Sequence, residues 1–95
     1  MTLGFTETAQ AETEAATAWY EAQRPGLGVE FLAALDEAIE AVRTHPQAYP
    51  VVLRDIRRAR LPRFPYSLFY RVHDEQLLVI ACFHARRDPR IWRRR

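Results

Sequence analysis

The side chains best suited to chemistry in this 95-residue chain are its arginines, which gather in the second half of the sequence. All 14 basic residues are arginine, because the chain contains no lysine. Residues 51–95 carry twelve arginines against four acidic residues, a net charge of +8, whereas residues 1–50 carry eight acidic residues against two arginines, a net charge of −6. Planar guanidinium groups bind phosphate and carboxylate groups in a bidentate manner. The second half therefore predicts a binding surface for RNA, DNA or an acidic protein; the alternative is a strand whose charges discourage aggregation.

Eight arginines lie on or beside the strands expected in this half: Arg57, Arg58, Arg60, Arg63, Arg71, Arg86, Arg87 and Arg90. If these strands are neighbours, the eight side chains can form one basic surface. Phe64, Tyr66 and Trp92 could stack on bases beside it, although aromatic residues of a small domain more often belong to the core. We include Trp92 with the eight arginines in the predicted binding set.

A catalytic role needs a proton-transfer group, because arginine stays protonated in proteins and cannot act as a general base. A nuclease would use His84, His73 or a tyrosine for this step, with arginines stabilising the charge on the phosphate. His84 is the best placed, since it ends an expected strand and lies close to Arg86. The alternative is that His84 hydrogen-bonds to nearby backbone.

Neither a metal nor another cofactor is expected. His45 is expected to cap a helix and His73 to lie in a turn, and the three histidines lack the spacing of a metal site. The chain also lacks a glycine-rich phosphate-binding loop and a nucleophile elbow.

The single cysteine, Cys82, stands in the apolar run 77–83, which predicts a buried, unreactive thiol and excludes an internal disulfide. No apolar stretch reaches the roughly 18 residues of a transmembrane helix. The first residues lack the basic flank and apolar segment of a signal peptide. We therefore expect a cytoplasmic protein that does not enter a membrane.

The first half of the chain predicts a strand at residues 2–6 and two helices. The first helix is expected at residues 8–23, capped by Thr6 or Thr8, and the segment 24–28, with its proline and glycines, ends it. One side of this helix is expected to carry Ala9, Ala16, Trp19 and Tyr20. The second helix ends before Pro46, and its apolar residues recur every three or four positions: Leu27, Phe31, Leu35, Ala38, Ile39 and Val42. The short link predicts an antiparallel helical hairpin over residues 8–45.

The second half predicts strands. Residues 51–53 and 56–61 are typical of short or edge strands, residues 66–73 alternate between two faces, and the apolar run in residues 76–84 is typical of a strand buried on both faces. The expected order is β-α-α-β-β-β. This is an α+β fold in which the helical hairpin packs on a small, mainly antiparallel sheet at residues 51–85. We expect one domain over residues 1–95, ending in a basic tail at residues 86–95.

Several short motifs resemble those of one family of small proteins. They are the run Ala18–Gly28 followed by Phe31-Leu32, then His45-Pro46, Arg58, Arg63–Tyr66, Tyr70-Arg71-Val72, and the ending His84–Pro89 with Trp92. In this order they resemble the RelE/ParE superfamily of toxins from bacterial type II toxin–antitoxin systems. The resemblance implies a plasmid-stabilising, growth-arresting toxin, held in a hetero-oligomer by a cognate antitoxin whose C-terminal segment wraps it.

The resemblance leaves two functions open. RelE-like members cleave mRNA on the ribosome, often with lysines, whereas ParE-like members inhibit DNA gyrase. This chain has no lysine, and its His-x-Arg-Arg-Asp-Pro ending resembles ParE, so the resemblance favours a gyrase inhibitor neutralised by an antitoxin. The alternative is a ribosome-dependent mRNA endoribonuclease, with His84 as acid or base and Arg58, Arg71 and Arg86 on the scissile phosphate. A third possibility is an inactive relative that binds only the antitoxin.

Overall fold

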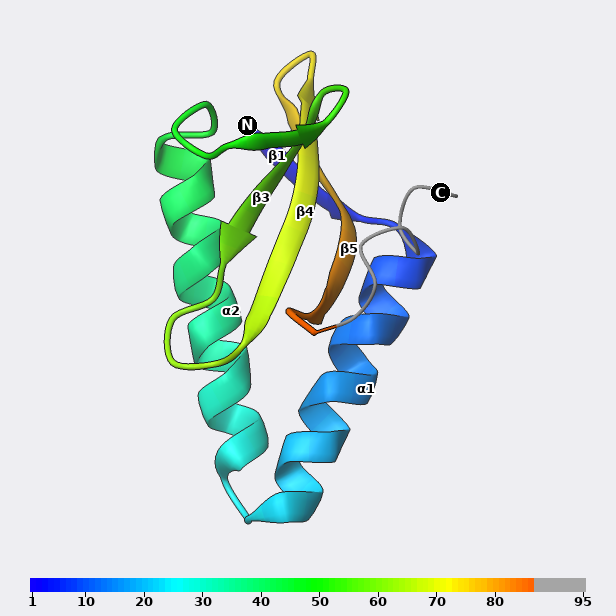
Figure 1. Ribbon diagram of the computed structural model, residues 1–95, viewed down its shortest axis with the longest axis vertical. Coiled ribbons are helices and arrows are strands. Elements are labelled where there is room, and N and C mark those ends of the chain that lie inside the picture. Colours follow the sequence, from blue (N-terminus) through cyan, green and yellow to red (C-terminus); the bar gives the residue numbers. More distant parts are fainter. Residues whose placement is uncertain (87–95) are drawn as a thin grey trace.

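Five strands form one mixed sheet in the computed structural model, which describes residues 1–86. The elements are β1 (Thr2–Phe5), α1 (Glu7–Gln23), α2 (Leu27–Thr44), β2 (Val51–Leu53), β3 (Ile56–Arg60), β4 (Tyr66–His73) and β5 (Gln76–His84). The strand order is β1-β5-β4-β3-β2, with β1 parallel to β5 and the other neighbours antiparallel. The helices meet at their turn and diverge away from it (Figure 1). This confirms the expected α+β fold.

The element order differs from the expected one by a strand. Four strands follow the helices instead of three, because the short β2 pairs with β3 through Val51 and Arg57. The expectation that residues 51–53 form a short edge strand is therefore confirmed, and the order β-α-α-β-β-β is extended to β-α-α-β-β-β-β. Within residues 1–86, neither helix has the length and apolar composition needed to cross a membrane.

The first helix buries a stripe that the sequence only partly predicted. Thr6 caps α1, since its hydroxyl accepts a hydrogen bond from the backbone N–H of Ala9 at 3.1 Å. The buried residues are Ala9, Thr13 and Ala16, and Tyr20 packs against the same core. Trp19 was expected on this side, but 58% of it is exposed. The stripe has steps of four, three and four residues, which places Trp19 at its margin.

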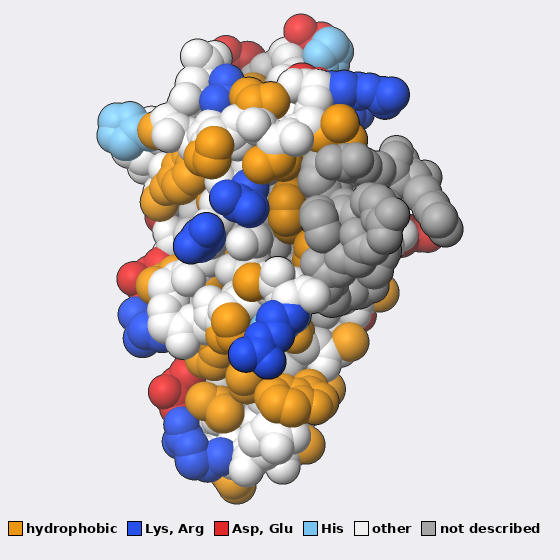
Figure 2. All heavy atoms as spheres, in the orientation of Figure 1, with side chains coloured by type: hydrophobic (Ala, Val, Ile, Leu, Met, Phe, Trp, Pro, Cys, Tyr) orange, Lys and Arg blue, Asp and Glu red, His pale blue; other side chains and the backbone are white. Residues whose placement is uncertain are grey.

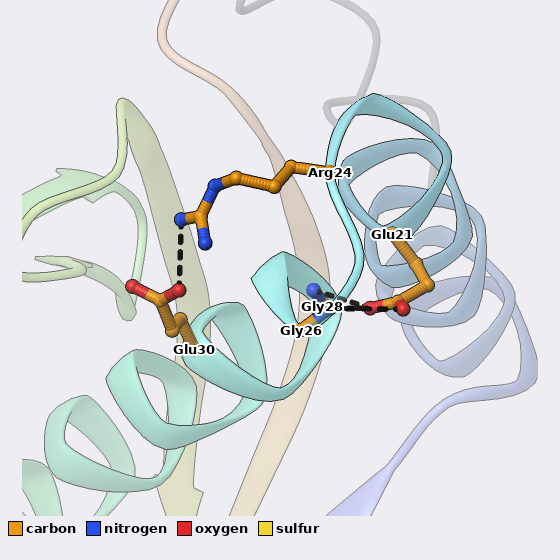
Figure 3. Close-up of polar contacts among 5 residues, drawn as sticks. All are labelled: Glu21, Arg24, Gly26, Gly28 and Glu30. Atoms are coloured by element: carbon orange, nitrogen blue, oxygen red, sulfur yellow. Dashed lines mark hydrogen bonds and ion pairs between the residues drawn. The ribbon is translucent and has the colours of Figure 1, made fainter.

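The turn between the helices is held by a carboxylate (Figure 3). Glu21 of α1 accepts hydrogen bonds from the backbone N–H groups of Gly26 at 3.0 Å and Gly28 at 3.0 Å. Gly26 has a φ of 91°, which glycine adopts readily. A Cβ on Gly28 would lie 3.0 Å from both the Glu21 carboxylate and the carbonyl oxygen of Thr17. Both amide hydrogen bonds lower the pKa of Glu21, and the bond from Gly26 has the larger effect. A carboxylate therefore caps the second helix from the first.

The main core lies between the helices and one face of the sheet. From α2 it contains Phe31, Ala34, Leu35, Ala38, Ile39 and Val42, and from the sheet Ala59, Leu68, Tyr70, Leu77, Val79 and Cys82. At the turn end, Tyr20, Phe31, Phe64 and Tyr66 form an aromatic cluster with ring centroids between 4.8 and 5.9 Å apart. The periodicity of α2 and the alternation of β4 are thus explained by one shared core.

A bulge in β5 divides its apolar residues between the two faces. Phe69 pairs with Ala81 and Tyr70 pairs with Val79, so Ile80 is an extra residue between these pairs. Val79 and Cys82 therefore face the helices, whereas Ile80 and Ala81 both face away and join a second cluster. The prediction that this strand is buried on both faces is confirmed.

The first residues of α1 support this bulge. The hydroxyl of Thr6 donates to the carbonyl oxygen of Ile80 at 3.4 Å, and the backbone N–H of Cys82 donates to the carboxylate of Glu12 at 3.0 Å. The parallel pairing of β1 with β5 ends at the Phe5 and Val79 pair. Side chains of the cap and the helix thus continue the contacts that β1 no longer makes.

The connection from α2 to β2 is fixed by two side chains of the sheet. The hydroxyl of Tyr70 donates to the carbonyl oxygen of Pro46 at 2.7 Å, and Arg57 donates to the carbonyl oxygens of Gln47 at 3.2 Å and Tyr49 at 2.6 Å. Burial raises the pKa of Tyr70 to about 12, so this donor stays protonated across the neutral range.

We predict that Tyr70→Phe lowers the free energy of unfolding by about 1–2 kcal/mol, because the carbonyl of Pro46 loses its buried donor. Urea denaturation followed by circular dichroism measures the change. Tyr20→Phe is the matched control, because the Tyr20 hydroxyl forms no hydrogen bond among residues 1–86. The free energy of unfolding of this variant should therefore change little. Equal stability of Tyr70→Phe and the wild type would contradict this role.

Candidate functional site

Three arginines share the sheet face that the helices do not cover. The register pairs Arg58 with Phe69, Arg60 with Ser67 and Arg71 with Leu78, and these partners point away from the helical layer. We call this surface, with the apolar residues Ile56, Phe69 and Ile80 between the arginines, the arginine face. On the side where β3 and β4 lie in front, arginine side chains are spaced between hydrophobic ones (Figure 2). The face combines cationic groups with an apolar floor.

The arginines of this face differ in how far their charges are already used. Arg71 forms an ion pair with Asp55 at 3.2 Å, and its Nε is buried without a hydrogen-bond partner among the described residues. Arg58 and Arg60 form no ion pair within residues 1–86. As far as residues 1–86 are concerned, these two guanidinium groups are available for a carboxylate or phosphate of a partner.

Two predicted binding residues lie elsewhere and have structural contacts. Arg57 alternates with Arg58 along β3, so it faces the helical side and holds the loop carbonyls described above. Arg63, in the β3–β4 loop, forms an ion pair with Glu37 of α2 at 2.6 Å. The expectation of one surface for all the sheet arginines is therefore corrected, because strand alternation and this loop divide them.

The end of the chain contributes only in part. Arg86 follows β5, and its backbone N–H donates to Nδ1 of His84 at 3.0 Å. Arg87, Arg90 and Trp92, which complete the predicted binding set, and most of the predicted tail lie outside the described residues.

His84 lies on the opposite face of the sheet from the arginine face. It pairs with Tyr66, whose ring faces the helices and lies 5.4 Å from the His84 ring. Because Nδ1 accepts a hydrogen bond, the neutral ring carries its proton on Nε2. The structure therefore does not bring His84 together with Arg58 and Arg71, which point away from the helices. A nearby backbone contact, the alternative expected for His84, is present.

His84 instead lines a pocket beside α1, which the sequence did not reveal. The pocket has a volume of about 270 Å³ and is lined by Glu12, Ala15, Ala16, Trp19, Tyr66, Cys82, Phe83 and His84. Trp19 was expected on the same side of α1 as Ala9, Ala16 and Tyr20, so its exposed ring was not recognised as a wall of this pocket.

A second concavity lies between the two helices. We call it the hairpin groove; its volume is about 410 Å³, and it is lined by Thr13, Glu14, Thr17, Ala18, Glu21, Gly28, Val29 and Leu32. Val29 and Leu32 are apolar but lie outside the core-facing stripe of α2, and this is the sequence feature that could have indicated the groove. Among residues 1–86, no group of His, Cys, Asp and Glu side chains is arranged to hold a metal ion.

Comparison with known proteins identifies the family. Residues 3–89 match the family model described as the ParE toxin of the type II toxin–antitoxin system parDE. The chain belongs to the ParE toxin family. The resemblance to the RelE/ParE superfamily is therefore confirmed. Among curated proteins, no significant match to this ParE family member was found.

Solved structures share the fold of this ParE family member. A chain of the chromosomal ParDE system from P. aeruginosa is 22% identical, with a TM-score of 0.66, and the match covers 88% of this chain and 95% of that one. A chain of the intact E. coli RelBE toxin–antitoxin complex is 25% identical, with a TM-score of 0.66, and the match covers 90% of this chain and 98% of that one. A chain of the toxin–antitoxin complex RelBE2 from Mycobacterium tuberculosis is 24% identical, with a TM-score of 0.59, and the match covers 87% of this chain and 88% of that one. The fold thus occurs in both ParDE and RelBE systems.

We predict that Cys82 reacts with a thiol reagent only on unfolding. It is 1% exposed, and burial raises the pKa of its thiol to about 11, so roughly one molecule in a thousand carries the thiolate at pH 8. Absorbance with a chromogenic disulfide reagent at pH 8, with and without urea, measures this. Rapid labelling of the folded protein would contradict the assignment of Cys82 to the core.

Proposed function

We propose that this ParE family member is a toxin that acts by binding, with DNA gyrase as its target and a cognate antitoxin as its inhibitor. The observation that carries the proposal is the separation of His84 from Arg58 and Arg71 by the sheet. A nuclease needs its proton-transfer group and its phosphate-binding groups around one scissile bond. A toxin that acts by binding has no such requirement, so the observed arrangement favours it.

The surfaces suit a cognate antitoxin in two ways. The arginine face offers Arg58 and Arg60 to an acidic segment. The outermost strands β1 and β2 leave edges to which an extended segment can add a strand. We infer a toxin–antitoxin hetero-oligomer in the bacterial cytoplasm, in keeping with the ParDE and RelBE complexes that share the fold.

The proposal predicts that the purified chain inhibits supercoiling of relaxed plasmid DNA by gyrase. His84→Ala should inhibit to within about twofold of the wild type, because a binding toxin loses no proton-transfer step. Gel electrophoresis of the topoisomers measures both. Undisturbed supercoiling at a large molar excess of the folded wild type would overturn the gyrase assignment.

An endoribonuclease is the second candidate, because Arg58 and Arg71 share one face and the fold matches RelBE at 25% identity. On this hypothesis, His84→Ala reduces mRNA cleavage by about 100-fold or more, because it removes the acid or base. Arg58→Ala causes a loss of about 100-fold or more, because it removes a group that stabilises the charge on the phosphate. Mapping of mRNA 5′ ends after induction, together with growth curves, tests it. We expect growth arrest to persist in both variants without new cleavage ends; loss of arrest together with loss of such ends would favour the nuclease.

A further inference from the structure

The arginine face is a positively charged surface on strands that carry no carboxylate. Among residues 1–86, none of the five strands contains an aspartate or a glutamate. Asp55, in the β2–β3 turn beside this face, is paired with Arg71. The acidic residues of the first half of the chain all lie on the two helices, which cover the opposite side of the sheet. The molecule therefore has a positive and a negative side, and its field turns the arginine face toward a polyanion.

The arginines of this face are held at the regular intervals of a sheet. Arg58 and Arg60 lie two positions apart on β3, which is about 6.6–6.8 Å along the strand. Arg58 pairs with Phe69 of β4, so Arg71 is its diagonal neighbour, at about 7–8 Å. A guanidinium group can bind a phosphate through two N–H groups. Three such groups at these distances can each contact one of several neighbouring phosphates on a nucleic-acid backbone.

The residues between the arginines favour one kind of nucleic acid. Ile56 and Ile80 are apolar and cannot hydrogen-bond to the edges of bases, so the polar contacts of the face go to phosphates. Phe69 and Phe83 also lie on this face, but their rings stack on each other, with centroids 4.8 Å apart, and they are only 5% and 3% exposed. Single-stranded nucleic acids are held largely by bases that stack on aromatic side chains. The face therefore suits the backbone of a duplex better than a single strand.

We propose that the arginine face binds the sugar–phosphate backbone of duplex DNA without sequence preference. The source of this DNA rests on the function proposed above, because gyrase holds a DNA duplex that a toxin bound to gyrase can reach. Arg58 and Arg60 bind phosphates directly, since neither forms an ion pair within residues 1–86, and Arg71 adds a third positive charge. Carboxylates of an acidic protein are the other ligand that guanidinium groups accept, so the measurements compare the two.

Fluorescence anisotropy with a short labelled DNA duplex tests the proposal on the full-length chain without gyrase. Affinity should fall with salt, because each phosphate contact contributes about 0.9 to the slope of log K against log salt concentration. Arg58→Gln with Arg60→Gln should lower the affinity at least about tenfold at low salt and reduce the slope by about 2. Arg24→Gln with Arg43→Gln is the matched control, because it removes the same charge from the helical layer and should change neither value. The arginines after β5 are present in both variants, so the difference reports Arg58 and Arg60 alone.

A change of the opposite sign is expected at Asp55. Asp55→Asn removes the carboxylate that is paired with Arg71, so a third guanidinium group becomes free to bind a phosphate. The duplex should bind about threefold more tightly or better, and the slope should increase by about 1. Asp36→Asn makes the same change at an exposed position of α2 and is the control, with no expected effect. Unchanged or weaker binding by Asp55→Asn would overturn the assignment of Arg71 to the site.

Two other polyanions test the choice of ligand: polyglutamate with the same number of charges, and single-stranded RNA with the same number of phosphates. The duplex should bind most tightly, because its charges lie about 1.7 Å apart along the axis and binding releases the most counterions. Polyglutamate that binds as tightly would assign the face to an acidic protein, and RNA that binds more tightly would assign it to a ribonuclease; either result overturns the proposal. Duplex affinity that survives the loss of Arg58 and Arg60, or no duplex binding by the wild type at low salt, also overturns it.

The supercoiling assay then separates this inference from the proposed function, with circular dichroism to confirm that each variant is folded. If the wild type inhibits gyrase and the Arg58→Gln, Arg60→Gln variant does so at least about tenfold less well than the Arg24→Gln, Arg43→Gln control, the face contacts DNA in the inhibited complex. If all three inhibit equally, the inference fails and the gyrase assignment stands. If the wild type binds the duplex through these arginines without inhibiting gyrase, the gyrase assignment fails, whereas the assignment of the arginine face to DNA stands.

Discussion

The bulge at Ile80 decides which side chains of this toxin can act together. Side chains alternate strictly along a regular strand, so Val79 on the helical face would place His84 on the opposite face, beside the arginines. The extra residue moves Cys82 and His84 to the helical face instead. One inserted residue thus changes His84 from a neighbour of Arg58 and Arg71 into a wall of the pocket beside Trp19. The case for binding over catalysis depends on this shift.

The bulge is stable because its polar groups find partners at the start of α1. Thr6 has two roles, since its hydroxyl caps the helix and contacts the carbonyl of Ile80. Glu12, one and a half turns further, accepts from the amide of Cys82. Buried amides and carbonyls without partners each cost about 1–3 kcal/mol, so these contacts make the interruption of the strand affordable. The position of α1 and the phase of β5 are therefore coupled.

Most of the fold could be predicted from the sequence, because its signals are local. The stripe of α2, the alternation of β4 and the prolines and glycines between elements each follow from backbone geometry over a few residues. The phase of β5 could not be predicted, since every residue from Leu77 to Phe83 is apolar and any assignment of faces fits the pattern. The sequence also placed Trp19 on the same side of α1 as Ala16, because an aromatic residue three positions after Ala16 fits a helical stripe as well as Tyr20 does.

The candidate site was harder to predict than the fold, because it depends on contacts between residues that are distant in the sequence. Consecutive arginines on β3 are equivalent in a count of charge, yet Arg57 supports a loop on one face of the sheet, while Arg58 lies on the other face and forms no ion pair within residues 1–86. Likewise, the carboxylate of Glu21 is a single negative charge in the sequence, but in the fold it closes the hairpin. Only pairing partners across the sheet and between the helices distinguish structural charges from available ones.

The uneven distribution of charge acquires a physical meaning from these contacts. Of the three arginine–carboxylate ion pairs formed within residues 1–86, only that between Arg63 and Glu37 joins the acidic first half to the basic second half. Exposed pairs contribute about 0–1 kcal/mol each, so the fold gains little from bringing more of these charges together. Keeping them on separate layers costs little stability and leaves two surfaces of opposite sign.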